Sequence, residues 1–418
     1  MFEITSHYNS YLGLNRETMR LVVSLHLPDQ AQIAYSRVAL AIVLDCSGSM
    51  AGEKIRAACN GAIKVIQELD EQFSFVVVAF AQDAQVIYGP AEGIHGHKQK
   101  AIQAVQQLKA DGGTSMSSAL QAVIHAFDPY RERARTILFL TDGQNGDQKA
   151  TFLQSVEQCV HERMSIYAWG VGADWNADEL RALAERTHGR ADIIPHPQQI
   201  EAAFRQTFNQ IRQTALTNVR LALWTPEEVN VLQVEQAYPT LINLDMQPDS
   251  VNSRQQMVSL GLFAIGERRD FLITLKIQPH EPGRQYMILR PSVRFVDAQQ
   301  ADLEERGPRA SWVTVEWTLQ MALAAKINER VAHYTKEGEL ANLISQGNEA
   351  LASGDQRQAA ALLAQALDVS EQLKNEEIAR LLRAIVTRDA GGQPVLKQVD
   401  AVTRRTLEIK RGTTAQLS

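Results

Sequence analysis

The first of three short polar segments in this chain places oxygen ligands where a parallel sheet would end. The segment Asp45-Cys-Ser47-Gly-Ser49 follows the apolar run 38–45 and precedes a helical pattern. One carboxylate and two hydroxyls at alternate positions of a tight loop can face one point, and Gly48 gives that loop its backbone freedom. In open α/β sheets this end of a strand is the edge where ligands bind.

Two further segments end in the same way. Thr114 follows the turn Asp111-Gly-Gly and precedes a helix, and Asp142-Gly143 follows the apolar run 137–140. Because loops at the carboxyl ends of parallel strands lie along one rim, the sequence predicts a single site whose ligands are all oxygens. Its members are Asp45, Ser47, Ser49, Thr114 and Asp142. Such a set favours Mg²⁺, with Mn²⁺ and Ca²⁺ as alternatives, although each residue alone could merely cap a helix or close a turn.

Taken together, the pattern Asp45-x-Ser47-x-Ser49, Thr114 and Asp142 resembles the metal-ion-dependent adhesion site of the von Willebrand factor type A family. The resemblance implies that Ser47, Ser49 and Thr114 bind the ion directly or nearly so, and that the two aspartates bind it directly or through water. It also implies that one coordination position is left for a partner protein. The expected partner therefore supplies an Asp or Glu side chain to the metal.

The elements that must position these residues alternate between two periodicities. Between 37 and 213, short apolar runs alternate with helical patterns, which is typical of a doubly wound parallel-sheet α/β domain. From 214 to 318, short alternating segments separated by Pro, Gly and Asn indicate an antiparallel β-sandwich. Residues 1–36 include the similar segment Met19–Leu27. We therefore expect the N-terminal strands to join the sandwich, with the α/β domain inserted into it.

Helical periodicity returns in the C-terminal part of the chain. Residues 319–388 predict an α-helical hairpin that turns at Gly354-Asp355, and 389–418 predict a flexible basic tail. From Arg388 onward there are six basic and three acidic side chains, so this segment carries +3 while the rest of the chain carries −9. The basic segment could lie on the acidic body of the same molecule or dock elsewhere.

Four threonines of the predicted tail are candidate phosphorylation sites: Thr403, Thr406, Thr413 and Thr414. Thr406 followed at the third position by Ile409 is similar to peptides that forkhead-associated domains bind after phosphorylation, and the upstream arginines suit a Ser/Thr kinase. A phosphate would add a charge of about −1.5 to −2. The simpler interpretation is an unmodified tail, since short motifs of this kind are common.

Composition and flanking regions limit the class of protein. The 418 residues carry a net charge of −6, which argues against general attraction to nucleic acid, and the three cysteines fit a reducing cytoplasm. No signal peptide or membrane segment is visible. The layout is similar to type A proteins of the calcium-activated chloride channel-like and inter-alpha-trypsin inhibitor groups, with cytoplasmic bacterial members as the closer comparison.

The leading hypothesis is a non-enzymatic, Mg²⁺-dependent protein-interaction module within a bacterial signalling or assembly complex. The alternative is a regulatory substrate of a Ser/Thr kinase, whose phosphorylated tail is bound by a forkhead-associated domain. An enzyme is the third hypothesis, and it lacks a visible base or nucleophile with a supporting partner beside the three loops.

Overall fold

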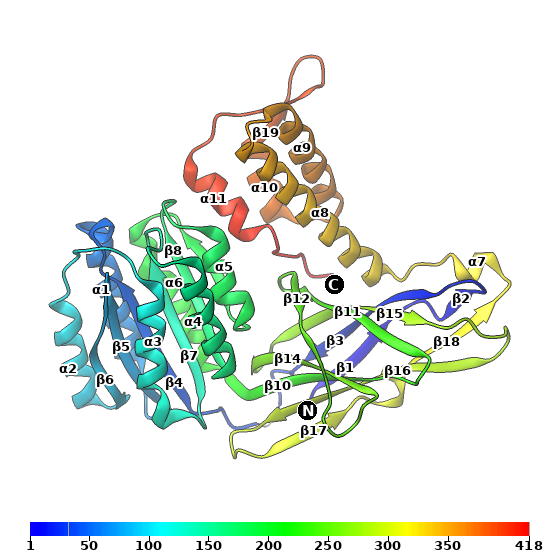
Figure 1. The fold of residues 1–418 in the computed structure, drawn as a ribbon, viewed down its shortest axis with the longest axis horizontal. Helices are drawn as coiled ribbons and strands as arrows, with labels where there is room; N and C mark the ends of the chain where they lie inside the picture. Colours follow the sequence, from blue (N-terminus) through cyan, green and yellow to red (C-terminus); the bar gives the residue numbers. More distant parts are fainter. Residues whose placement is uncertain (32, 418) are drawn as a thin grey trace.

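The computed structural model describes residues 1–31 and 33–417. The chain forms an α/β domain, a β-sandwich and a helical region, which Figure 1 shows from blue at the N-terminus to red at the C-terminus. The β-sandwich contains strands from both before and after the α/β domain. The predicted insertion of the α/β domain into the sandwich is therefore confirmed.

The α/β domain is built on a six-stranded sheet in the order β6-β5-β4-β7-β8-β9. Its strands are β4 (Val38–Asp45), β5 (Phe73–Phe80), β6 (Ala84–Glu92), β7 (Ala134–Thr141), β8 (Met164–Val171) and β9 (Arg190–Ile194). Every residue of the central strands β4 and β7 is buried, as their near-continuous apolar sequence requires. The edge strand β6 runs antiparallel to β5, so the expectation of a wholly parallel sheet is wrong at this edge.

Helices cover both faces of this sheet, as predicted for a doubly wound domain. The helices are α1 (Glu53–Glu68), α2 (His95–Gln106), α3 (Met116–Ala126), α4 (Lys149–His161), α5 (Ala177–Arg186) and α6 (Ile200–Arg212). The apolar cluster on one face includes residues of α1, α2 and α6, and the cluster on the other face includes residues of α3, α4 and α5. The sheet is therefore buried on both sides.

The sandwich consists of two sheets that enclose a separate apolar core. One sheet has the order β1-β3-β15-β11-β12, and its strands are β1 (Glu3–His7), β3 (Thr18–His26), β11 (Val229–Tyr238), β12 (Ile242–Leu244) and β15 (Arg268–Ile277). The N-terminal strand β3 lies antiparallel to β15, with Met19 opposite Leu275. The N-terminal residues thus complete a sheet formed mainly by later strands.

The second sheet has the order β13-β14-β10-β16-β18-β2, with β17 also paired to β16. Its strands are β2 (Tyr11–Gly13), β10 (Thr214–Trp224), β13 (Met246–Pro248), β14 (Gln255–Ala264), β16 (Gln285–Val296), β17 (Asp302–Arg306) and β18 (Val313–Thr318). The N-terminal strand β2 is parallel to β18, with Leu12 opposite Trp317. Both sheets therefore depend on residues that precede the α/β domain.

The helical region contains the predicted hairpin and more. Its helices are α7 (Met321–Ala324), α8 (Glu329–Ala352), α9 (Gln356–Gln372) and α10 (Glu376–Ile385). The hairpin between α8 and α9 turns at Gly354, where φ is +85°, and Asp355 caps α9 by accepting a hydrogen bond from the Gln358 backbone N–H. The third long helix, α10, packs on α9 and turns the predicted hairpin into a small bundle.

The prediction of a flexible tail over 389–418 is wrong for its described residues. They include β20 (Pro394–Leu396), which pairs with β19 (Val386–Arg388), and the helix α11 (Ala401–Lys410). Asp400 caps α11, and both Leu407 and Ile409 are buried. We call residues 401–417 the C-terminal strap, because this segment lies against all three parts of the molecule (Figure 1).

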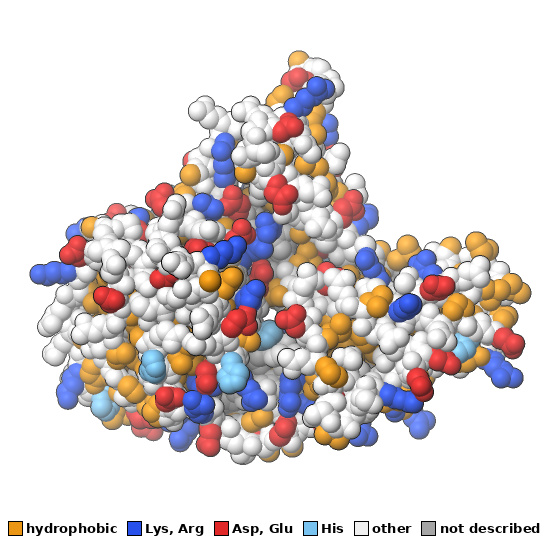
Figure 2. All heavy atoms as spheres, in the orientation of Figure 1, with side chains coloured by type: hydrophobic (Ala, Val, Ile, Leu, Met, Phe, Trp, Pro, Cys, Tyr) orange, Lys and Arg blue, Asp and Glu red, His pale blue; other side chains and the backbone are white. Residues whose placement is uncertain are grey.

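The basic charge of the strap is used within the molecule. Lys410 forms ion pairs with Glu377 of the helical region and, at 3.6 Å, with Asp192 of the α/β domain. Arg411 lies 3.9 Å from Asp178 of α5. Figure 2 shows acidic and basic side chains interspersed over this junction. The docking of the basic segment on the acidic body, one of the two expected placements, is the one that the structure shows.

Within 1–31 and 33–417, no helix is both long and apolar enough to cross a lipid bilayer.

Candidate metal centre

The first loop of the site begins where β4 ends at Asp45. The Asp45 side chain is fully buried, its Oδ1 accepts a hydrogen bond from the Ser47 backbone N–H at 2.8 Å, and its Oδ2 accepts one from Thr141 Oγ1 at 2.6 Å. Burial raises the pKa of Asp45, and these hydrogen bonds act in the opposite direction. Asp45 therefore holds the first loop against the end of β7.

The predicted hydroxyl ligands converge on one point. Ser47 Oγ lies 3.0 Å from Ser49 Oγ, and Ser49 Oγ donates to Asp142 Oδ1 at 2.6 Å. A methyl group added at Gly143 would lie 3.2 Å from Ser49 Oγ, 3.4 Å from Thr114 Oγ1 and 3.9 Å from Ser47 Oγ. All three hydroxyl oxygens thus lie within 4 Å of one position beside Gly143, next to the Asp142 carboxylate.

Backbone hydrogen bonds hold the three loops to one another. The Gly48 N–H of the first loop donates to the Gly112 carbonyl of the second at 3.0 Å. The Gly146 N–H of the third loop donates to the Thr114 carbonyl at 2.7 Å. The hydroxyls are therefore positioned by a braced backbone, a form of preorganisation that binding sites require.

Sequence reasoning missed one residue of this site. Lys54, in the first turn of α1, forms an ion pair through Nζ with Asp142 Oδ2. The Asp142 side chain is fully buried, and the Lys54 side chain is 27% exposed. The sequence carried no signal for this pair, since the two residues are 88 positions apart and a helical lysine usually faces solvent.

The donor set fits a small, hard divalent cation. The five side chains present hydroxyl and carboxylate oxygens, and the described residues contain no group of three or more His, Cys, Asp or Glu that could hold a metal. The absence of such a group is consistent with the predicted site, because most of the predicted ligands are hydroxyls of Ser and Thr. Oxygen ligands with few carboxylates suit Mg²⁺, which usually retains several waters.

A doubly wound sheet with this oxygen cluster at the carboxyl edge of its central strands is the arrangement of a von Willebrand factor type A domain. Residues 38–193 match the family model described as von Willebrand factor type A domain, and the chain contains such a domain. Domains of this family are known protein-interaction modules and typically bind a divalent metal at this position.

Relatives extend beyond this domain. The chain is 26% identical over 380 residues to the uncharacterized protein sll0103 of Synechocystis sp., with 88% of each chain covered. It is 24% identical over 188 residues to mouse inter alpha-trypsin inhibitor, heavy chain 4. This match covers 42% of this chain and 20% of that protein. The matched part of the chain therefore spans about a fifth of the heavy chain's length. None of these relatives has the name of an enzyme.

Two solved structures share the whole architecture. A von Willebrand factor type A protein from Catenulispora acidiphila matches with a TM-score of 0.91 and 26% identity, covering 100% of this chain and 97% of the other. The ArnB paralog VWA2 from Sulfolobus acidocaldarius matches with a TM-score of 0.63 and 16% identity, covering 98% and 97%, and shows the fold alone. The α/β domain, sandwich and helical region thus occur together in other chains.

The candidate phosphorylation sites lie within folded structure. Thr403 forms part of the α11 cap, where its Oγ1 donates to Asp400 at 2.9 Å, and Thr406 Oγ1 donates to the Val402 carbonyl at 2.7 Å. Thr413 pairs with Thr240 of the sandwich. Thr414 is buried, and its Oγ1 donates to the Ala237 carbonyl at 2.7 Å. A kinase would therefore need the strap to undock before it could reach Thr414.

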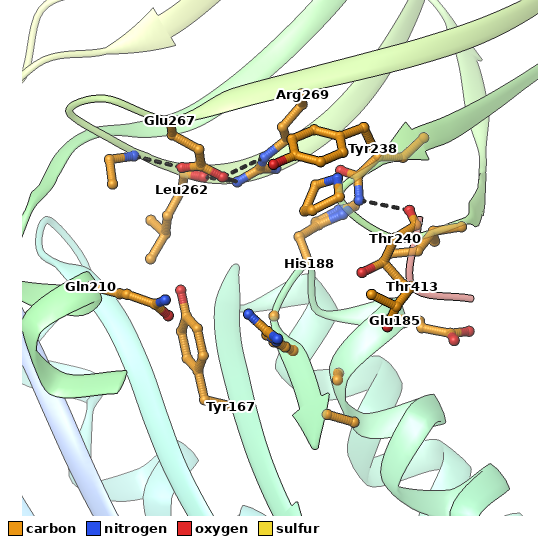
Figure 3. A pocket seen from close by; sticks show the side chains of 18 of the residues that line it. Tyr167, Glu185, His188, Gln210, Tyr238, Thr240, Leu262, Glu267, Arg269 and Thr413 are labelled. Carbon is orange, nitrogen blue, oxygen red and sulfur yellow. Dashed lines mark hydrogen bonds and ion pairs between the residues drawn. The ribbon is translucent and has the colours of Figure 1, made fainter. Parts of the chain in front are cut away.

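A cavity of about 560 Å³ lies between the α/β domain, the sandwich and the strap (Figure 3). Its charged groups are already paired: Arg269 donates to Glu267 at 2.7 Å and to the Leu260 and Leu262 carbonyls at 2.6 Å each. His188 also lines the cavity, and burial lowers its pKa to about 4, so the imidazole is neutral near pH 7. The cavity thus belongs to the junction between domains and contains none of the predicted metal ligands.

Replacing Gly143 with alanine is expected to weaken Mg²⁺ binding by about tenfold, or about 1.4 kcal/mol. The added methyl would lie 3.2 Å from Ser49 Oγ and would occupy the space between the three hydroxyls, so Ser49 Oγ would have to shift. Isothermal titration calorimetry measures the change. Gly96→Ala is the control, since a methyl there meets no atom within 4 Å. Equal Mg²⁺ affinity in both variants would contradict the placement of the metal beside Gly143.

Proposed function

We propose that this chain is a non-enzymatic protein-interaction module that binds an Asp or Glu of a partner protein through a Mg²⁺ ion. The ion would be held by Ser47, Ser49 and Thr114, with Asp45 and Asp142 binding directly or through water. The observation that carries the proposal is the convergence of the three hydroxyl oxygens on one position beside the Asp142 carboxylate.

The charges of the site favour a ligand from outside the chain. The predicted ligand set contains two carboxylates, and one of them, Asp142, is also neutralised by Lys54. Neutral hydroxyls leave a dipositive ion short of negative charge, so an external carboxylate is a favourable additional ligand. Bound metal would supply this Lewis-acid contact, and the side chains of the loops would orient it.

The first loop supplies no side chain that is free for catalysis. Cys46 is the one sulfur nucleophile within the first loop, and it is buried with its Sγ directed at the Leu44 carbonyl, 3.7 Å away. Asp45 is occupied by the Ser47 N–H and Thr141. Neither Cys46 nor Asp45 is therefore free to act as a nucleophile or to accept a proton from a substrate.

The proposed setting is the bacterial cytoplasm, in a signalling or assembly complex. The match to a Synechocystis protein over 88% of both chains supports a bacterial source, and the composition fits a reducing compartment. In this setting the sandwich and the helical region would position the metal site within the complex.

Capture of a partner from the native host by immobilised protein tests the proposal. We expect capture in Mg²⁺, loss in EDTA and recovery when Mg²⁺ is added back. Asp142→Asn should remove the Mg²⁺ dependence without lowering the melting temperature to the point of unfolding. Asp83→Asn, at an exposed acid in the loop between β5 and β6, is the matched control. Capture that is indifferent both to EDTA and to Asp142→Asn would refute a metal-mediated contact.

A further inference from the structure

We propose that Lys54 is a built-in competitor of the divalent cation, which sets the Mg²⁺ affinity of the site by holding one oxygen of Asp142. The inference rests on the proposed metal site and adds a residue that determines how readily that site takes up metal.

Both oxygens of the Asp142 carboxylate are engaged within the chain. Oδ1 accepts a hydrogen bond from Ser49 Oγ at 2.6 Å, and Oδ2 is paired with Lys54 Nζ. Because Asp142 is fully buried, its negative charge needs a counter-charge, and the Lys54 ammonium supplies it. A divalent ion that draws on the charge of Asp142 must therefore either displace the ammonium or share the carboxylate with it.

The helix that carries Lys54 does not explain its position. Lys54 lies in the first turn of α1, at the positive end of the helix dipole, where a cation is unfavourable. The positions one turn later, at which an acidic side chain could form an ion pair with it, are occupied by Ala57 and Ala58, which carry no charge. The interaction with Asp142 on the other side of the site is thus the contact that holds this side chain.

The cation at this site is paired with one of the two predicted aspartate ligands, Asp142. Asp45 and Asp142 are both fully buried, and among the described residues Lys54 is the basic side chain that forms an ion pair with either. A unit positive charge at the carboxylate repels an incoming dipositive ion and lowers its affinity. The Lys54 side chain is partly exposed and flexible, so its ammonium can move toward water when the ion binds.

Isothermal titration of the full chain with MgCl₂ at fixed ionic strength tests the inference. Lys54→Met should bind Mg²⁺ at least about tenfold tighter than the unmodified protein, because the competing charge is gone. Lys54→Arg keeps the charge and should stay within about twofold of the unmodified protein. Arg56→Met, an exposed position two residues along the same helix, is the control for loss of one positive charge and should also stay within about twofold.

A second measurement does not require Mg²⁺. In EDTA, Lys54→Met should melt at a lower temperature than Arg56→Met, because the buried Asp142 charge has lost its partner. Added Mg²⁺ should then raise the melting temperature of Lys54→Met by more than that of the unmodified protein.

The outcomes separate this inference from the proposed function. Mg²⁺ binding that is equal or weaker in Lys54→Met, while the unmodified protein binds Mg²⁺, overturns the role of Lys54 and leaves the metal site standing. Absence of Mg²⁺ binding in the unmodified protein and in all variants overturns both. Tighter binding in Lys54→Met with no change in Arg56→Met supports the inference.

Discussion

Leu407→Ala is expected to lower the free energy of unfolding by about 2–4 kcal/mol, the cost typical of removing a buried leucine. Leu407 lies on α11 and is 1% exposed, within the apolar cluster of the helical region that includes Leu340 and Ile344. The truncation leaves a cavity between α11 and this region. Denaturant unfolding measures the loss, and hydrogen exchange over 401–417 should show earlier opening of the strap.

The control for this prediction is the same chemical change at an exposed position. Leu319 is 73% exposed, so Leu319→Ala should change the free energy of unfolding by less than about 0.5 kcal/mol. Ile409→Ala tests the other side of the strap, since Ile409 packs into the core of the α/β domain. Fast exchange of the strap in the unmodified protein, with no further effect of Leu407→Ala, would mean that α11 is not docked in solution.

The strap connects all three parts of the molecule through its backbone as well as its side chains. Past α11, the Gly412 carbonyl accepts a hydrogen bond from the Leu241 N–H at 2.8 Å, and the Thr414 N–H donates to the Pro239 carbonyl at 3.1 Å. Arg405 Nε donates to the Ala173 carbonyl in the loop after β8 at 3.3 Å. That loop lies on the same rim of the sheet as the predicted metal ligands, so the strap contacts the protein beside this rim.

The sequence could not predict α11 for a geometric reason. A helix on a protein surface has one apolar stripe, which produces spacings of three and four residues. Leu407 and Ile409 are two residues apart, so on a helix they point in nearly opposite directions. They do so because α11 lies between the helical region and the α/β domain and buries one side chain in each. A helix packed between two domains has no single apolar face, so its sequence lacks helical periodicity and resembles that of a loop.

The local sequence pattern was sufficient to predict most strands and helices of the α/β domain. Strands β4 and β7 are apolar throughout because they are buried on both faces, and each is followed by the polar loop that carries site residues. The direction of β6 was not predictable, since alternation of apolar residues is the same for a parallel and an antiparallel edge strand. Pairing direction depends on the length of the connection, and the short 81–83 turn permits a hairpin.

The same limit applies to the candidate site. Asp45, Ser47, Ser49 and Asp142 lie at the ends of β4 and β7 or directly after them, where the sheet topology brings them to one rim. Thr114 lies in the loop between α2 and α3, and its hydroxyl reaches the same position beside Gly143. Lys54 reaches the site from within a helix, through the length of its side chain. Sequence patterns locate backbone positions, whereas the reach of a long side chain across 88 residues of sequence separation appears in the folded structure.

We expect the docking of the strap to depend on pH, because a buried glutamate lies beneath it. Glu337 of α8 is 1% exposed, and its Oε1 accepts a hydrogen bond from the Ala415 N–H at 2.9 Å. Its Oε2 accepts one from Asn375 Nδ2 at 3.3 Å, and His333 Nε2 lies 3.7 Å from Oε1. Burial raises the pKa of Glu337 from its ordinary 4.5 to about 7 although these hydrogen bonds oppose the rise. The folded protein therefore holds this proton more tightly than the unfolded chain does.

The difference in proton affinity reduces stability as the pH rises. Below about pH 4.5, Glu337 is protonated in both states, and its full contribution is present. Between 4.5 and about 7, the unfolded chain releases the proton first, and the free energy of unfolding falls by about 3 kcal/mol in total. Glu337→Gln, which keeps the neutral shape, should therefore gain stability relative to the unmodified protein as the pH increases from 5 to 8. Urea unfolding at several pH values measures this difference.

The matched control is Glu339→Gln, at an exposed glutamate two residues along the same helix. It removes the same charge without altering a buried group, so its effect on the free energy of unfolding should change little between pH 5 and 8. Parallel pH profiles for Glu337→Gln and the unmodified protein would mean that the carboxyl is already ionised in the folded state, and that the contact with Ala415 is made by a carboxylate. If Glu337 is neutral beneath the strap, the two profiles should converge or cross as the pH rises. The glutamine variant should then be the more stable protein at pH 8.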